Sequence, residues 1–449
     1  MTALDWDRVS EESVNLFRDL LRIDTTNPPG NERPAAERLA RLFEGAGIEY
    51  TLIESAPTRA NIVARLKGSG DKGPLLLNGH LDVVPADAEH WSQPPFEANI
   101  ANGCIWARGT IDMKNMVAMS AMTLVLMKRA GKVPDRDLIF CGVADEEAGS
   151  EFGSLFLVEK HPELVRSEFV LNEVGGHTLH FGNTRFYPVQ VSEKGICWFE
   201  VLSEGEPGHG SMPHPDNAVV KLARAVAKLG KARLPQHNTH VVERFLRTLA
   251  ESAPFPQNKA LPLLLEPRLA GTLLEVLAKQ NPDQARGIGA MLRNTVSPTL
   301  LSAGRKVNVI PSQARAQIDG RTIPGQTVSS FLEEVQDVVG PDVRLNVMTQ
   351  HDGVTFPDRT PLFDAITKVI ASHDPEGQVV PYMIPGFTDA FAYARLGATV
   401  YGFSPVKLPA DLNFTRMYHG HNERIPVDGY TWGQRVLFDL VEGFTSQQK

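Results

Sequence analysis

The sequence predicts an α/β protein in which a central, mostly parallel sheet flanked by helices is interrupted by an inserted α+β segment. A chain of 449 residues is too long for one ordinary hydrophobic core, so two domains are expected. Short apolar runs alternate with helical stretches up to about residue 188 and again from about residue 361, whereas longer alternating strands lie between them. We therefore expect one discontinuous domain, 1–188 with 351–449, and an inserted domain at 189–350.

The elements of the first domain follow from the spacing of apolar residues. Helical spacing predicts helices over 10–22 and 33–46, and the Asn-Pro-Pro-Gly sequence at 27–30 breaks the chain between them. Short apolar runs of the kind buried in a central sheet follow. These runs are at 75–77, 138–143 and 168–171, and two further strands are expected before them, at 50–53 and 61–66.

The inserted domain is expected to have strands at 188–202, 314–321 and 343–348 and a helix over 217–229. Residues 237–301 predict an extra helical stretch. Its apolar side chains must be covered, either in a core or, in part, along a substrate channel. They are Phe245, Leu249, Leu264, Leu265, Leu273 and Leu277. The α/β pattern resumes with a helix at 361–371.

Composition and charge narrow the class of protein. The 42% of hydrophobic and 22% of charged residues are typical of a folded chain. The net charge of -8, without a run of Lys or Arg, argues against a nucleic acid or an anionic membrane as partner and favours a small-molecule or peptide substrate. Cys104, Cys141 and Cys197 lack any C-x-x-C spacing, so a metal would be held by His and carboxylates.

The location is predicted from two segments. The first ten residues lack a basic start followed by an apolar stretch, so a secretory signal is not expected. The most apolar segment, 116–127, is too short to span a bilayer and predicts a buried helix. We therefore expect a cytoplasmic protein.

Metal-ligating residue types recur just beyond the C-terminal ends of the apolar runs or at the start of a helix. The candidates are His80, Asp112, Glu146, Glu147, Glu173 and the segment from His419 to Glu423. In open α/β sheets, active sites form at that edge. Together these groups supply enough nitrogen and oxygen ligands for two adjacent metal ions, which favours a metal-dependent hydrolase.

A two-metal hydrolase needs a carboxylate shared by the two ions, terminal ligands on each ion and a separate base. Asp112, in a tight segment that opens a helix, is our choice for the shared carboxylate. In the Glu146-Glu147 pair, one carboxylate can bind metal while its neighbour takes a proton. Asp82 lies two residues after His80 on an extended stretch, so it can fix the second ring nitrogen.

Each group alone has a simpler explanation. A His at a strand end is commonly a hydrogen-bonded structural residue, and a Glu pair is commonly a solvated face. An Asp before a helix is ordinarily an N-cap, worth about 1 kcal/mol to the helix. Five such groups, each after its own apolar run, do not fit a set of unrelated caps and surface charges, so the metal interpretation is preferred.

Four stretches of the sequence resemble the zinc exopeptidase and deacylase family. They are 78–85 (NGHLDVVP), 107–114 (ARGTIDMK), 145–149 (DEEAG) and 419–423 (HGHNE), in the family's order. The family contains aminoacylase, acetylornithine deacetylase, succinyl-diaminopimelate desuccinylase, glutamate carboxypeptidase and carboxypeptidase S. The resemblance implies a cofactor of two zinc ions, with manganese or cobalt as substitutes.

The resemblance also implies a role for each candidate. The ligands would be His80 and Glu173 on one zinc ion, Glu147 and His419 on the other, and Asp112 between the two. Glu146 would be the general base that activates the bridging water and then protonates the leaving amine. A cis peptide at Asp112-Met113 is implied as well.

The same resemblance implies that the inserted domain is a ferredoxin-like lid carrying a homodimer contact. The segment 208–213 (GHGSMP) matches the motif whose histidine, here His209, reaches a neighbouring active site and stabilises the tetrahedral oxyanion. The positions that match those gripping the substrate carboxylate are Asn308, Arg321, Gly386 and Thr388. A surface salt bridge is the alternative for Arg321, and the 237–301 stretch leaves the dimer open because it could cover the contact edge.

The 237–301 stretch and residues 323–327 look most like the carboxypeptidase S branch, which includes hydrolases of N-fatty-acyl amino acids. Glu173, where the family's peptidases tend to have Asp, favours N-acyl-amino-acid hydrolysis over peptide cleavage. We expect a di-zinc amidohydrolase acting on small substrates with a free carboxylate. A dipeptidase or carboxypeptidase is the close alternative, and a non-catalytic protein that binds acyl amino acids is a remote one.

Overall fold

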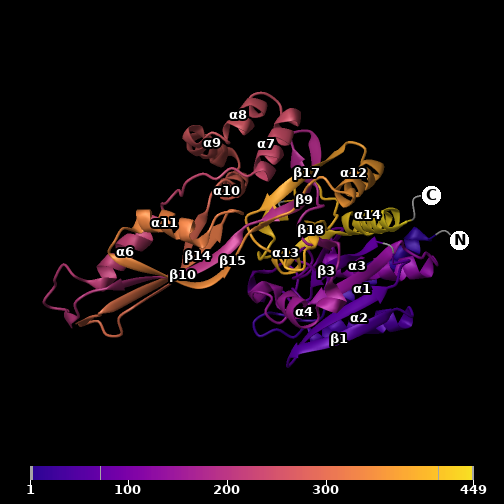
Figure 1. Cartoon of the computed structure of the whole chain (residues 1–449), viewed down its shortest axis with the longest axis horizontal. Coiled ribbons are helices and arrows are strands. Elements are labelled where there is room, and N and C mark those ends of the chain that lie inside the picture. The colour runs from indigo at the N-terminus through magenta and orange to yellow at the C-terminus, as the bar shows by residue number, and fades with distance from the viewer. Residues whose placement is uncertain (1–3, 71, 413, 447–449) are drawn as a thin grey trace. The chain divides into compact units, whose positions relative to one another are not determined.

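The computed structural model describes residues 4–70, 72–412 and 414–446, and the chain divides into two compact units. The first unit consists of Met1–Val191, Phe356–Tyr382 and Thr388–Lys449, and the second of Ser192–Thr355 and Met383–Phe387. Each unit has a sheet and helices of its own (Figure 1).

The first unit is built on a large mixed sheet whose central strands are parallel. These are, in spatial order, β6 (Arg136–Val143), β3 (Lys72–His80), β7 (Phe169–Asn172) and β18 (Thr399–Gly402). The outer strands pair antiparallel: β2 (Arg59–Leu66) with β6, β1 (Glu49–Ala56) with β2, and β9 (Thr184–Glu193) with β18. A two-residue connection joins β1 to β2, and only antiparallel strands can be joined so closely. The predicted fold class is confirmed, with the parallel pairing confined to the centre of the sheet.

Helices cover this sheet. They are α1 (Trp6–Leu21), α2 (Arg33–Gly45), α3 (Lys114–Arg129), α4 (Ser154–Lys160), α5 (Pro162–Val165), α12 (Pro361–His373), α13 (Ala390–Ala394) and α14 (Val427–Thr445). The shorter strands are β4 (Asn99–Ala101), β5 (Cys104–Trp106) and β19 (Arg424–Pro426), which form a small separate sheet, and β8 (Leu179–Phe181) and β17 (Gly377–Ile384), which pair with β9. Among the helices of the described residues, none is both long and apolar enough to cross a membrane.

Helix α3 is buried along nearly its whole length, as the sequence predicts. Every residue from Lys114 to Met127 is buried, and the helix packs against β3, α1 and α14 (Figure 1). Burying one such Leu, Val or Met side chain contributes roughly 1.5–3 kcal/mol. This packing fixes the start of α3, and with it the backbone that carries Asp112 two residues earlier.

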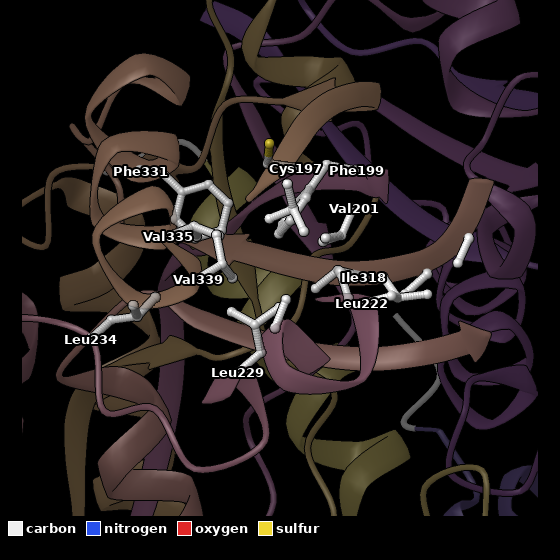
Figure 2. Packing of buried hydrophobic residues seen from close by; sticks show 14 of the residues in the cluster. Cys197, Phe199, Val201, Leu222, Leu229, Leu234, Ile318, Phe331, Val335 and Val339 are labelled. Carbon is white, nitrogen blue, oxygen red and sulfur yellow. The ribbon is translucent and has the colours of Figure 1, made fainter. Parts of the chain in front are cut away.

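The second unit is ferredoxin-like, as the family resemblance implies. Its elements follow in the order β10 (Gly195–Glu204), α6 (Ala218–Leu229), β12 (Thr295–Ala303), β14 (Gln313–Thr322), α11 (Val328–Val339) and β15 (Val343–His351). This is the β-α-β-β-α-β connectivity, and the antiparallel sheet has the order β12-β14-β10-β15. Figure 2 shows Leu222 and Leu229 of α6 and Phe331 of α11 packed against side chains of β10 and β14. The short strands β11 (Gly208–His209), β13 (Val309–Ile310) and β16 (Val354–Thr355) complete the unit.

Residues inserted between α6 and β12 form a group of helices. They are α7 (His240–Ser252), α8 (Gln257–Leu263), α9 (Pro267–Gln280) and α10 (Pro282–Met291). Of the apolar residues singled out from the sequence, Phe245, Leu249, Leu264 and Leu265 are buried, whereas Leu273 and Leu277 are half-buried.

Two expectations for the second unit are wrong. The helical stretch does not continue to residue 301, because Thr295–Ala303 is an edge strand paired with β14. An edge strand tolerates Pro298, which has no backbone N–H to donate to a neighbouring strand. The single strand expected over 188–202 is two strands, β9 and β10, which belong to different sheets and are separated at Lys194. A continuous apolar alternation cannot reveal where a chain leaves one sheet for another.

Candidate metal centre

The carboxyl ends of three neighbouring parallel strands bring the predicted ligands together. His80 is the last residue of β3, Glu173 follows the last residue of β7, and Glu146 and Glu147 follow β6 after a short turn. Because β6, β3 and β7 are adjacent and parallel, these ends meet at one edge of the sheet.

Among the described residues, two groups of His and carboxylate atoms could each hold a metal ion, with the ligand atoms of each group within 4.8 Å of one another. The first group is His80, Asp112 and Glu173, and the second is Asp112, Glu147 and His419. His80 Nε2 lies 2.9 Å from Asp112 Oδ1, and His419 Nε2 lies 3.2 Å from Asp112 Oδ2 and 3.0 Å from Glu147 Oε2. Asp112 therefore presents one oxygen to each group, the arrangement expected of a shared carboxylate.

Glu146 lies beside both groups. Its carboxylate is 4.0 Å from His80 Nε2 and is almost fully buried. Burial, followed by the charge of Glu173, raises the pKa of Glu146 well above its usual value. A carboxylate with a raised pKa accepts protons more readily, as a general base requires.

The pKa values of the candidate ligands are also shifted from their usual values. Burial, with the charge of Asp112 adding to the shift, raises the pKa of Glu147 to about 7 and that of Glu173 to about 8. Hydrogen bonds to Asp112 and Glu147 raise the pKa of His419 to about 10. Burial opposes the charged forms of Asp112 and His80, but hydrogen bonds between them lower the pKa of the carboxyl and raise that of the ring. The groups interact strongly with one another.

The donor set fits divalent metal ions. Imidazole nitrogens and carboxylate oxygens suit zinc, manganese and cobalt. Glu147 Oε1 is buried and has no hydrogen-bond partner among the described residues, so one oxygen of this carboxylate is left for a ligand that the protein does not supply. The residues that would hold metal are therefore His80, Asp112, Glu147, Glu173 and His419.

The backbone around Asp112 is held by Glu423, whose individual role the sequence did not reveal. Its carboxylate is fully buried and accepts hydrogen bonds from the backbone N–H groups of Gly109, Ile111 and Asp112, at 3.0, 2.6 and 3.2 Å. It also accepts a hydrogen bond from Arg108 Nη1 at 2.8 Å. The Asp112-Met113 peptide is cis, which confirms that expectation.

Asp82 contacts His80 chiefly through its backbone. His80 Nδ1 lies 3.0 Å from the Asp82 carbonyl oxygen and 3.5 Å from its carboxylate. The carboxylate instead accepts hydrogen bonds from the backbone N–H groups of Glu146 and Glu147, both at 3.2 Å, and from Asn27 Nδ2 at 2.9 Å. Asp82 thus links the His80 ring to the turn that carries Glu146 and Glu147.

A buried ion-pair network supports the same turn from another side, and no sequence pattern indicated it. Asp145 has φ of 68°, a left-handed conformation that a non-glycine residue adopts only with support. Its carboxylate accepts from Arg59 Nη2 at 2.7 Å and from Asn27 Nδ2 at 3.1 Å. Arg59 also donates to both oxygens of Glu32, at 2.7 and 2.8 Å.

The predicted substrate residues fall into two units. In the second unit, His209 on β11 is exposed, with its Nδ1 2.7 Å from Ser211 Oγ, and Asn308 accepts a backbone hydrogen bond from Gly210. Arg321 donates through Nε and Nη2 to Asp319, at 2.7 and 3.1 Å, so the local salt bridge considered for it is present. Its Nη1 is buried and has no partner within the part of the chain that the structure describes.

The remaining two candidates have backbone or buried contacts. Gly386, in the second unit, accepts a hydrogen bond from the Lys194 N–H through its carbonyl oxygen. Thr388, in the first unit, is buried, and its hydroxyl oxygen accepts hydrogen bonds from Asn172 Nδ2 and from the Ala390 N–H.

A mixed sheet whose carboxyl edge gathers two histidines and several carboxylates around Asp112, with Glu146 buried beside them, is the arrangement of a metal-dependent hydrolase. Residues 76–443 match the model of the peptidase family M20/M25/M40. The chain belongs to this family, which confirms the resemblance drawn from its motifs.

Two curated relatives and one solved structure illustrate the similarity. The chain is 30% identical over 390 residues to the human (Homo sapiens) N-fatty-acyl-amino acid synthase/hydrolase PM20D1, covering 84% of this chain and 75% of that protein. It is 29% identical over 445 residues to human aminoacylase-1, covering 97% and 95%. Its fold is similar to that of the metallo-carboxypeptidase Sso-CP2 of Sulfolobus solfataricus, with a TM-score of 0.72 at 16% identity over 97% of this chain and 99% of that one.

Proposed function

We propose that this protein is a di-zinc hydrolase that cleaves N-acyl amino acids with a free carboxylate. The observation that carries the proposal is the pair of ligand groups that share Asp112, with Glu146 buried beside them. The names of the relatives support the substrate class, since one is an N-fatty-acyl-amino acid synthase/hydrolase and the other an aminoacylase.

In this proposal His80 and Glu173 hold one ion, Glu147 and His419 the other, and Asp112 bridges them. Zinc ions bound there would polarise the amide carbonyl and lower the pKa of the attacking water. The protein's own part is to fix the ligands, and Asp82 and Glu423 do so through the hydrogen bonds described above.

Glu146 is the proposed general base. Its carboxylate takes a proton from the attacking water as the oxygen bonds to the amide carbon. It then gives the proton to the nitrogen as the carbon–nitrogen bond breaks, so that one water and one amide yield a carboxylic acid and an amine. The raised pKa of Glu146 suits both steps, because the proton must be accepted and then released.

In the second unit, His209 is the proposed donor to the oxyanion. The proposed contacts of the substrate carboxylate are Asn308, Arg321 and Gly386 of the second unit and Thr388 of the first. His209 is exposed and so is free to reach another surface, which supports a homodimer in which it serves a neighbouring active site. Because Asp319 accepts hydrogen bonds from Nε and Nη2 of Arg321, the proposed donor to the carboxylate is Nη1, which has no partner among the described residues.

The test is hydrolysis of N-acetyl, N-long-acyl and dipeptide forms of one amino acid by zinc-replete enzyme, with a chelated sample as control. Chelator-sensitive cleavage that favours the acyl amino acids supports the proposal. A preference for dipeptides would make the enzyme a dipeptidase or carboxypeptidase with the same centre. Binding of acyl amino acids without cleavage of any substrate, with two zinc ions bound, would refute the hydrolase proposal and leave a binding protein.

A further inference from the structure

A buried polar cluster lies in the first unit behind the edge that carries the candidate ligands. We call it the Asp389 cluster; it consists of Asn78, Ser150, Ser154, Asn172, Thr388, Asp389 and Tyr393. Each of these residues is at most 1% exposed. Polar side chains are rarely buried so completely in one place, and a buried carboxylate is costly unless several donors satisfy it.

Asp389 is the centre of this cluster. Its Oδ1 accepts hydrogen bonds from Ser150 Oγ at 2.9 Å and Ser154 Oγ at 2.5 Å, and its Oδ2 accepts one from Asn78 Nδ2 at 3.0 Å. Burial raises the pKa of Asp389, while the hydrogen bonds from Ser154, Asn78 and Ser150 act in the opposite direction. None of the hydrogen-bond partners described above is a candidate ligand or the base, so Asp389 supports the ligand geometry through these neighbours, while its charge also acts on His80 and Glu146.

The cluster reaches the strands that end in ligands. Asn78 lies on β3 two residues before His80, and its Nδ2 also donates to Asn172 Oδ1 at 2.9 Å. Asn172 is the last residue of β7 and immediately precedes Glu173. The ends of β3 and β7 are therefore tied to one another, and to Asp389, within two residues of their ligands.

The cluster also reaches the segment after the base. Ser150 N donates to the Asp145 carbonyl oxygen at 2.6 Å, which closes the turn that carries Glu146 and Glu147. Ser154 begins α4, and Gly153 before it packs so closely that a Cβ there would clash with the carbonyl oxygen of Ala144. Asp389 holds both serine hydroxyls, so it fixes this turn against β3.

We propose that Asp389 is a positioning residue that sets the spacing between the ends of β3 and β7 and the Glu146-Glu147 turn, and thereby the geometry in which the centre binds metal. The inference rests on the proposed metal centre but not on any substrate. Ligands must be held within about 0.5 Å of their productive positions by their supporting residues. The three segments belong to different strands and loops, and Asp389 is bonded to two of them directly and to the third through Asn78.

The test compares Asp389→Asn with Asp374→Asn in the full-length protein. Asp374 is a matched buried carboxylate of the first unit: it is 3% exposed and accepts hydrogen bonds from Arg185 Nε and Nη2 and from the Tyr187 hydroxyl, at 2.8, 2.7 and 2.8 Å. The readouts are zinc affinity by competition with a chromogenic chelator, the visible spectrum of the cobalt-loaded protein, and kcat and KM with the substrate that the wild type prefers.

We expect Asp389→Asn to weaken zinc binding about 10- to 100-fold and to alter the cobalt spectrum, as changes in the residues that support metal ligands do. The loss of activity at saturating metal should be in kcat more than in KM. Asp374→Asn should lower thermal stability but keep the wild-type zinc affinity and cobalt spectrum. A purely structural role for Asp389 would give the same result for both variants.

A folded Asp389→Asn protein with wild-type zinc affinity and cobalt spectrum would overturn the inference. If that variant does not fold, the Ser150→Ala, Ser154→Ala double variant, which keeps the carboxylate and its bond to Asn78, takes its place with the same expectation and the same contrary result. Failure of the wild type itself to bind two zinc or cobalt ions would instead refute the proposed function.

Discussion

Substitution of Glu423 by Gln tests whether the loop before α3 is held by the buried carboxylate. Glu423 Oε1 accepts from the Ile111 and Asp112 N–H groups, and Oε2 accepts from the Gly109 N–H and from Arg108. The amide nitrogen of Gln must replace one of these oxygens, so two donors lose their acceptor whichever way the side chain turns. A buried donor left unpaired costs about 1–3 kcal/mol, and more when the donor is charged.

The expected loss is therefore about 2–6 kcal/mol, a large share of the roughly 5–15 kcal/mol that stabilises a typical folded protein. A chain of two units need not unfold in one step. The measurement is therefore the urea midpoint of the transition in which the first unit unfolds, monitored by far-UV circular dichroism. The matched control is Glu12→Gln, which removes half-exposed ion pairs with Arg8 and Arg129 and should cost no more than about 1 kcal/mol. Equal midpoints for the Glu423 and Glu12 variants would refute the reasoning.

The remaining predictions concern the base, the protons and the ion-pair network. Glu146→Gln should keep both zinc ions, measured by metal analysis, and lose nearly all turnover. The control Glu151→Gln, at a neighbouring exposed position, should keep its turnover. Near wild-type turnover in the Glu146 variant would contradict the proposed base. Since the pKa of His419 is raised to about 10, its ring is protonated at neutral pH before metal binds. Zinc affinity should therefore increase from pH 6 to pH 8, and calorimetry in two buffers should detect the release of protons. A zinc affinity that does not change with pH would contradict the role of His419 as a ligand. Arg59→Met leaves Glu32 buried without its cation, which should destabilise the protein by about 3–5 kcal/mol in thermal unfolding. A change in stability within experimental error would show that the network contributes nothing.

The parallel strands and the polar residues at their ends were predictable because both leave local signals. An apolar run marks each buried strand, and the polar residue after it marks the edge of the sheet, as at Leu77 to His80 and at Phe140 to Glu146. The ferredoxin-like unit was implied by the family resemblance and not by the residues alone. The strand at 295–303 was missed because its pairing with β14, and not its own pattern, decides its conformation.

The supporting residues could not be predicted, because their partners are distant in the sequence. Glu423 bonds to the Asp112 N–H across 311 residues, and Asn78 bonds to Asp389 across the same separation. Arg59 bonds to Asp145 across 86 residues. No sequence periodicity relates such positions. Their hydrogen bonds depend on the folded arrangement of the strands, which the sequence pattern does not specify. The sequence could indicate candidate metal ligands, but not the groups that hold those candidates in place.

Hydrogen-bond donors are distributed differently between the supporting carboxylates and the carboxylates at the sheet edge. Each supporting carboxylate has several donors of its own: Glu423 has three N–H groups and Arg108, and Asp389 has two hydroxyls and an amide. The groups that face one another at the sheet edge have no such surplus, because four carboxylates, Asp112, Glu146, Glu147 and Glu173, share two histidines. Burial and mutual repulsion raise the pKa of Glu147 to about 7 and that of Glu173 to about 8, so bound protons neutralise part of the negative charge. Divalent cations at the proposed centre would neutralise these carboxylates more completely, so the repulsion between them would become binding energy for metal.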